Sequence, residues 1–194
     1  MGCIKKMKAL GISGSPRKNG NTAFSVKYAL EQLHLKNIDT EYFSLSNMNI
    51  GSCKSCWKCS TNSICFQKDD MKFLYEAFRK ADVIILGSPV YFGMVSGIMK
   101  NMMDRCVVFR PSYERPLELE GKTGCGIACG GFRNGGQETT LQNIHTFLMQ
   151  QNMKVINDGF PYSHAGATIV DEAANDAIGL KTIDNLVNNI IKLV

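Results

Sequence analysis

The 194-residue sequence lacks several features that would place it in particular classes of protein. It contains no apolar run of the roughly 20 residues that a membrane-spanning helix needs. Residues Met1 to Lys6 provide no apolar core of the kind found in a signal peptide. The net charge of +5 is small and is spread over 22 lysines and arginines, which does not favour nucleic-acid binding. We therefore expect a cytoplasmic protein that binds neither membranes nor nucleic acids.

Proline is also scarce, with 5 residues, whereas cysteine is abundant, with 8. The remaining composition is ordinary for a globular protein, with 44% hydrophobic and 20% charged residues. A chain of this length can bury a sizeable core without covalent cross-links, so we expect a single domain over residues 1–194. Disulfides are rare in a reducing compartment, and clustered cysteines are therefore more often metal ligands or redox groups.

Short apolar runs alternate with helical patterns along the chain. Buried strands are predicted at 7–12, 39–45, 82–89, 123–129 and 153–157. Helices are predicted at 22–35, 69–80, 96–106, 137–151 and 172–192. Five strands alternating with helices predict an α/β fold, a doubly wound parallel sheet covered by helices on both faces.

Ligands of such sheets bind beyond the carboxyl ends of the strands, where the first predicted strand is followed by "SGSPRKNGNT". This loop leads into the N-terminus of a helix, whose backbone N–H groups and dipole favour an anion such as phosphate. It matches neither the P-loop nor the G-x-G-x-x-G pattern, and a solvated strand–helix loop is the alternative. The candidate phosphate donors are Ser13, Ser15, Arg17, Asn21 and Thr22.

The loops that follow the third and fourth strands suit a planar ligand. In "GSPVYFGMVSG", Tyr91 and Phe92 could pack against a ring and Gly93 would allow a close backbone approach, although both aromatics could instead cap the core. In "CGGFRNGGQETT", backbone donors and Arg133 could meet the polar edge of a heteroaromatic ring. A phosphate cradle, an aromatic pair and a glycine-rich loop at one sheet edge together favour a mononucleotide such as FMN.

The segment "CKSCWKCSTNSIC" brings four cysteines together, with the spacing C-x2-C-x2-C-x5-C. Three successive cysteines at two-residue intervals are similar to the run that wraps a cubane in bacterial ferredoxins, whereas zinc sites usually have two separated pairs. No acidic residue lies between the cysteines, while Lys54 and Lys58 could offset the negative charge of a cluster. Trp57 could shield the cluster or anchor the loop to the core. We expect a [4Fe–4S] site, with zinc and free thiols as alternatives, on Cys53, Cys56, Cys59 and Cys65.

The segments "GISGSPRKNGNT", "ILGSPVYFGMVSGIMKNMMDR" and "GGFRNGGQETT" resemble those of the flavodoxin-like NAD(P)H-dependent FMN reductases. The cysteine segment followed by "KDDM" resembles the iron–sulfur flavoprotein branch of that family. The resemblance implies a five-stranded flavodoxin-like fold with a cluster-binding loop at about 47–69. It also implies a homodimer or dimer of dimers, in which "MKNMMDR" contributes to the dimer contact. The flavin ring would be contacted by Pro89, Val90, Tyr91, Phe92, Gly93, Gly131, Phe132 and Arg133, and the phosphate by the residues named above.

By this resemblance the protein is an oxidoreductase, or a pure electron carrier, that holds FMN and a [4Fe–4S] cluster. It would transfer electrons between a low-potential donor such as ferredoxin and an acceptor. NAD(P)H is a further candidate donor, although no dedicated nicotinamide motif is present. The alternatives are a cluster-free NAD(P)H-dependent FMN or quinone reductase, with a structural or zinc-binding cysteine loop, and a zinc-bearing interaction module. No catalytic residue beyond the cofactors is predicted.

Overall fold

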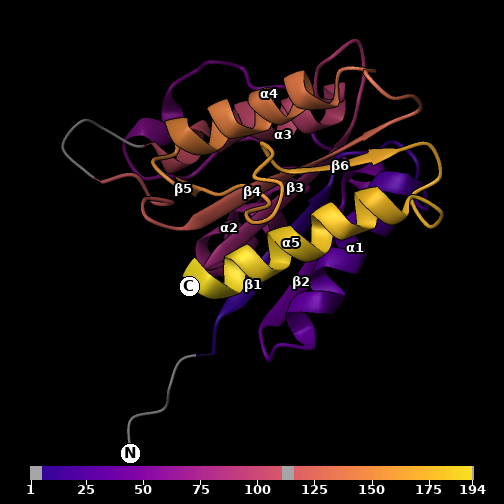
Figure 1. The fold of residues 1–194 in the computed structure, drawn as a ribbon. Coiled ribbons are helices and arrows are strands. Elements are labelled where there is room, and N and C mark those ends of the chain that lie inside the picture. The colour runs from indigo at the N-terminus through magenta and orange to yellow at the C-terminus, as the bar shows by residue number, and fades with distance from the viewer. Residues whose placement is uncertain (1–5, 111–115, 194) are drawn as a thin grey trace, which may run out of the picture.

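The computed structural model describes residues 6–110 and 116–193 and shows a twisted parallel sheet with helices on both faces (Figure 1). The strands are ordered β2-β1-β3-β4-β5, with β6 also paired to β4. This order confirms the predicted doubly wound α/β fold. The strands are β1 (Lys8–Ser13), β2 (Asp39–Ser44), β3 (Val83–Pro89), β4 (Thr123–Gly130), β5 (Lys154–Val155) and β6 (Ala167–Val170).

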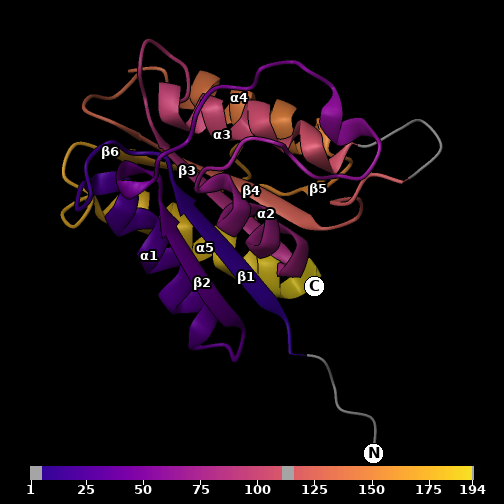
Figure 2. The same ribbon diagram turned by 180° about the vertical axis from the view of Figure 1, so that it is seen from behind.

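The helices divide between the two faces of the sheet (Figures 1 and 2). One hydrophobic cluster joins the sheet to α1 and α5, and the other joins it to α2, α3 and α4. The helices are α1 (Asn21–His34), α2 (Met71–Lys80), α3 (Gly97–Arg105), α4 (Gln137–Gln150) and α5 (Ala177–Leu193). The short 3-10 turns are η1 (Leu45–Asn47), η2 (Lys58–Ser60) and η3 (Cys106–Phe109).

Strand β3 shows why the sheet is buried on both sides. Val83 and Ile85 face the cluster beneath α1 and α5, while Ile84 and Leu86 face the opposite cluster. Successive side chains of a strand point to opposite faces, so a continuous apolar run fits a sheet that is covered on both sides. At the end of this run Gly87 lies under α1, where a Cβ atom would be 2.3 Å from a methyl group of Val26.

The fifth strand predicted at 153–157 is present but shorter, covering Lys154–Val155. Strand β5 pairs only with Thr123 and Gly124, and the same edge of β4 is continued by the unpredicted strand β6. The intervening residues leave the sheet because Asp158 is buried and contacts His164 at 3.2 Å, while Asn157 accepts a hydrogen bond from Asn189 of α5. Strand β6 has four residues, too few for its alternation to be recognised.

Several predicted helix boundaries also need correction. Helix α5 begins five residues later than predicted, because the Asp176 carboxylate accepts hydrogen bonds from the N–H groups of Gly179 and Val170 and caps the helix there. Helix α1 begins at Asn21, one residue earlier than predicted, and is preceded by Gly20 without a capping side chain. The methionines of α3, Met99, Met102 and Met103, lie in the core of this chain, so their burial does not depend on a dimer contact.

Among residues 6–110 and 116–193, no helix combines the length and the apolar character needed to cross a membrane. The sequence argument about Met1 to Lys6 concerns mainly residues 1–5, which lie outside the described part of the chain.

Candidate functional site

The loops after β1, β3 and β4 are joined by hydrogen bonds at one edge of the sheet. The N–H of Gly14 donates to the carbonyl of Gly87 at 2.8 Å, and the N–H of Val90 donates to the carbonyl of Cys129 at 2.9 Å. The hydroxyl of Ser96 donates to the carbonyl of Gly14 at 2.5 Å. These hydrogen bonds therefore hold side by side the three loops that the sequence assigned to one ligand site.

The loop of residues 13–22 is shaped by its own serine hydroxyls. Ser13 is fully buried and its Oγ accepts from the N–H of Ser15 at 3.5 Å, while Ser15 Oγ accepts from the N–H of Arg17 at 3.1 Å. In the described part of the chain neither hydroxyl donates to a protein group, so both keep a hydrogen for a ligand. Arg17 is exposed and forms no ion pair with a described residue, and it can add a charge-assisted hydrogen bond.

The N-terminus of α1 supplies further donors. Gly20 precedes the helix without a capping side chain, and the first turn contains no acidic residue, so its backbone N–H groups suit an anion. The side chain of Asn21, predicted as a phosphate donor, instead binds the carbonyl of Asp171 at 2.6 Å and the N–H of Ala173 at 3.1 Å. Thr22 is buried beside Gly87 and Cys129. Asn21 and Thr22 can therefore offer an anion their backbone N–H groups rather than their side chains.

The loop after β3 ends in a tight turn that displays an aromatic ring. Tyr91 and Met94 exchange two backbone hydrogen bonds of 3.0 Å, and the residues between them, Phe92 and Gly93, have φ values of +53° and +73°. A positive φ is costly for a phenylalanine, and such strain is concentrated at functional sites. The Phe92 side chain is fully exposed, and Tyr91 is half exposed, so neither caps the core.

The loop after β4 packs backbone to backbone against this turn. A Cβ atom on Gly136, whose φ is +104°, would lie 2.7 Å from the Cα atom of Gly93, so only glycine allows the approach. Gln137 holds the loop by donating to the carbonyl of Phe132 at 2.7 Å. Gly131, Phe132 and Arg133 are exposed at the tip.

Three residues that support this edge were not singled out from the sequence. Ser88 accepts from the N–H of Ser96 at 3.0 Å, and Ser96 in turn accepts from the N–H of Met99 as the N-cap of α3. Gln137 is the third. A serine directly before the predicted helix at 96–106 is a recognisable cap, but its bond to Gly14 in another loop could not be read from the sequence.

The cysteine loop, defined as residues 47–69, is wound tightly by its backbone. Ser55, Trp57 and Ser63 have positive φ values of +47° to +57°, and the N–H of Ser55 donates to Cys53 Sγ at 3.4 Å. Burial and then the nearby thiols of the other three loop cysteines raise the pKa of Cys59, although its backbone hydrogen bond lowers it. In the part of the chain that the structure describes, all cysteines are free thiols.

A buried arginine at the C-terminal end of α3 holds both ends of this loop. Arg105 is 1% exposed and forms a two-pronged ion pair with Asp69, with N–O distances of 2.5 and 3.0 Å. Its Nη1 also donates to the carbonyl of Gly51 at 2.9 Å, and its Nη2 to Cys65 Sγ at 3.4 Å. Asp104, the neighbour of Arg105 in the sequence, instead binds Lys100 at 2.6 Å. The long-range partners could not be read from the sequence.

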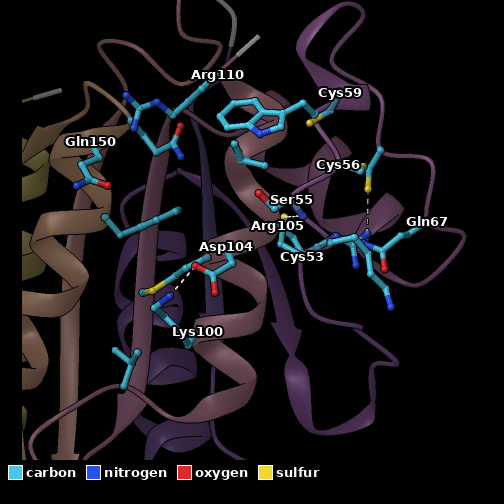
Figure 3. Close-up of a pocket in the computed structure, with 18 of the residues that line it drawn as sticks. Cys53, Ser55, Cys56, Cys59, Gln67, Lys100, Asp104, Arg105, Arg110 and Gln150 are labelled. Atoms are coloured by element: carbon cyan, nitrogen blue, oxygen red, sulfur yellow. Dashed lines mark hydrogen bonds and ion pairs between the residues drawn. The ribbon is translucent and has the colours of Figure 1, made fainter.

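A cavity of about 690 Å³ lies between the cysteine loop, α3 with η3, and one side of α4 (Figure 3). All four loop cysteines line it, as do Met94 and Val95 from the loop after β3. Cations outnumber anions on its wall: the charged lining residues are Lys54, Lys100, Asp104, Arg105 and Arg110. Trp57 also lines the cavity and is 65% exposed, so it does not anchor the loop in the core.

The residues present fit both expected groups. For FMN, the sheet edge has buried polar atoms without a partner among the described residues, Gln137 Oε1 and Thr140 Oγ1, beside uncapped helix N-termini. For an iron–sulfur cluster, four thiols line one cation-rich cavity, and the buried Nε of Arg105 has no partner in the described part of the chain. In residues 6–110 and 116–193 no three thiol, imidazole or carboxylate groups converge on the position of one metal ion.

Comparisons with known proteins agree with this geometry. Residues 7–168 match the family of NADPH-dependent FMN reductases. The chain is 42% identical to an iron–sulfur flavoprotein of Methanocaldococcus jannaschii, covering 97% of this chain and 99% of that protein. It is 37% identical to an iron–sulfur flavoprotein of Methanosarcina thermophila, covering 91% and 90% of the two chains.

Solved structures share the fold at low sequence identity. An NAD(P)H:quinone oxidoreductase from Methanothermobacter marburgensis has a TM-score of 0.72 at 13% identity and covers 95% of this chain and 99% of its own. A flavodoxin from the domain Archaea has a TM-score of 0.62 at 17% identity and covers 96% and 98%. These likenesses confirm the flavodoxin-like architecture.

Proposed function

Since the chain belongs to the family of NADPH-dependent FMN reductases, a family of flavodoxin-like oxidoreductases, we propose that it carries FMN and a [4Fe–4S] cluster. In this proposal it transfers electrons between a low-potential donor and an acceptor. When bound, FMN would exchange a hydride or single electrons and the cluster would exchange single electrons.

The observation that carries the proposal is that two sites share one structural element. The loop after β3 displays Tyr91 and Phe92 at the sheet edge, and its continuation, Met94 and Val95, lines the cavity of the cysteine loop. Helix α3 begins at this loop and ends at Arg105, which contacts Cys65. The ligand edge and the thiol cavity are therefore parts of one continuous framework.

At the sheet edge, Ser13, Ser15, Arg17 and the first N–H groups of α1 would hold the phosphate of FMN. Pro89 to Gly93 and Gly131 to Arg133 would contact its ring. The close approach of Gly93 and Gly136 keeps these two loops together and leaves their backbone donors at the ligand edge. Loops fixed in this way would orient the ring.

At the cavity, Cys53, Cys56, Cys59 and Cys65 would bind the cluster. The three cysteines at two-residue intervals favour the cubane over zinc, because zinc sites usually have two separated cysteine pairs. All four thiols line one cavity. The surrounding cations suit its negative charge.

The partners of the protein are proposed from the family and from its exposed surface. A ferredoxin-like carrier is the proposed donor, and NAD(P)H is the second candidate, as the family name indicates. Large apolar side chains near the two sites are more than 60% exposed, which supports a homodimer or dimer of dimers. They are Trp57, Ile64, Phe92, Met94 and Phe132. We also propose a cytoplasmic location, because the cysteines of the described residues are free thiols and a reducing compartment keeps thiols free.

Purification under anaerobic conditions tests the proposal. We expect about one FMN, four irons and four acid-labile sulfides per chain, measured by the ultraviolet–visible spectrum and by metal analysis. FMN without iron would support the cluster-free reductase, and zinc in place of iron would support a zinc-binding loop. Protein with neither FMN nor iron would contradict the proposal as a whole.

A further inference from the structure

Arg105 occupies an unusual position for a charged side chain. It is among the largest fully buried side chains of the described chain, yet it lies against a loop that is mostly exposed. A buried charge is costly unless it is paired and hydrogen-bonded. Asp69 supplies the pair, and its carboxylate also accepts hydrogen bonds from the N–H groups of Gly51 and Met71 at 3.1 and 3.2 Å.

Of the two charged groups in this ion pair, the guanidinium is the one that contacts a thiol of the loop. Nη2 of Arg105 donates both to Asp69 at 3.0 Å and to Cys65 Sγ at 3.4 Å, so the cation lies between the carboxylate and the sulfur. Among the described residues the Asp69 carboxylate has no hydrogen bond to a thiol, and it accepts instead from the backbone N–H groups of Gly51 and Met71. The positive end of this ion pair therefore points at the sulfur.

The geometry points to Arg105 as a positioning residue that clamps the cysteine loop and sets the reduction potential of the cluster through its hydrogen bond to Cys65. Hydrogen bonds and positive charge next to a ligand sulfur stabilise the more negative, reduced state of a cluster and raise its potential. Arginine suits this role because one planar group can serve Asp69, Gly51 and Cys65 together, which a lysine ammonium could not do in the same geometry. This inference rests on the proposed function.

The two partners of the ion pair should shift the potential in opposite directions. Replacing the cation with a neutral side chain, Arg105→Gln, removes positive charge and the N–H···S bond, so the cluster becomes harder to reduce. Asp69→Asn keeps the size of the side chain and leaves the guanidinium beside Cys65 without its counter-charge, so the cluster becomes easier to reduce. A residue that only holds the loop in shape would not give shifts of opposite sign.

The experiment is a redox titration of the anaerobically purified protein, followed by electron paramagnetic resonance, with iron and sulfide content measured on the same samples. For Arg105→Gln we expect the equilibrium constant of one-electron reduction to fall about tenfold, which corresponds to a potential about 59 mV lower. For Asp69→Asn we expect a rise of the same order. Lys80→Gln is the matched control, because it also removes one positive charge, from a side chain that is 64% exposed and that pairs, among the described residues, with Glu76. Its shift should stay within about twofold.

Equal shifts in Arg105→Gln and Lys80→Gln, or shifts of the same sign in both ion-pair variants, would overturn the inference while leaving the cluster in place. Should Arg105→Gln lose its iron, the upward shift in Asp69→Asn supports the inference by itself. Loss of iron from both variants would show that the network serves only to fold the loop, and would overturn it. Wild-type protein without iron would overturn the proposed function, and this inference with it.

Discussion

The loop after β1 and the cysteine loop are both candidate cofactor sites, but they are held in place in different ways. Residues 13–22 are bound to their neighbours by backbone and serine hydrogen bonds, and Ser13 and Ser15 are buried. The cysteine loop is largely exposed and relies on a few long-range side-chain contacts, among them those of Arg105, the bond from Arg79 to the carbonyl of Ser63 and the bond from Ser52 to Asn101. The first site is built by the sheet, and the second depends on individual side chains and on its ligand.

This difference predicts that the two sites can be lost separately, with the largest effect at the cysteine loop. We expect Cys56→Ser to lose most of its iron, because a hydroxyl is a poor replacement for a thiolate ligand, and to keep its FMN. Metal analysis and the flavin absorbance measure the two contents in one sample. Cys125→Ala removes a buried thiol outside the loop and should keep both groups. Loss of FMN together with iron from Cys56→Ser would show that the sites are not independent.

The phosphate loop should give a smaller, graded effect. The double change Ser15→Ala with Arg17→Gln removes a hydroxyl donor and a donor on an exposed side chain, each of which contributes roughly 0.5–1.5 kcal/mol. We therefore expect FMN binding about 10- to 100-fold weaker, as measured by titrating FMN into flavin-free protein and following fluorescence. Lys18→Gln, which removes a neighbouring charge from the same loop, should have less effect. Equal losses in the two proteins would indicate attraction by net charge alone.

The smallest expected effect is a loss of stability at low pH, caused by protonation of Asp69 at the end of the cysteine loop. Burial would raise the pKa of Asp69, but hydrogen bonds from Arg105 and from the N–H groups of Gly51 and Met71 lower it below the ordinary 3.8. The stability from the ionised carboxylate is therefore present above about pH 4 and is lost as the pH falls through the folded-state pKa. The difference in the free energy of unfolding between wild type and Asp69→Asn, measured by denaturant titration, should shrink as the pH falls below 4. A difference independent of pH between 7 and 3 would contradict the ion pair.

Much of the fold could be predicted because its signals are local. Residues 83–86 are apolar and buried at every position, and the Gly- and Ser-rich loops mark where strands end. Strand β6 was missed because four residues give too little pattern, and because the fifth strand is interrupted by a segment whose polar groups, Asp158 and Asn157, find partners only in the folded chain. The start of α5 was misplaced because Asp176, and not Glu172, caps it.

The candidate site also has features that the sequence predicts and features that only the folded chain reveals. The residue types and spacing in the sequence determined which loops carry donors, aromatics and thiols, because the chemistry of those groups belongs to the side chains themselves. Only the tertiary structure decided that the Asn21 amide binds the backbone of Asp171 and Ala173, and that a hydrogen bond from Ser96 joins two loops. It also decided that Arg105, 40 residues from Cys65, donates to its sulfur. A hydrogen-bond partner depends on which groups the packed sheet and helices bring within about 3 Å, and spacing along the chain does not specify it.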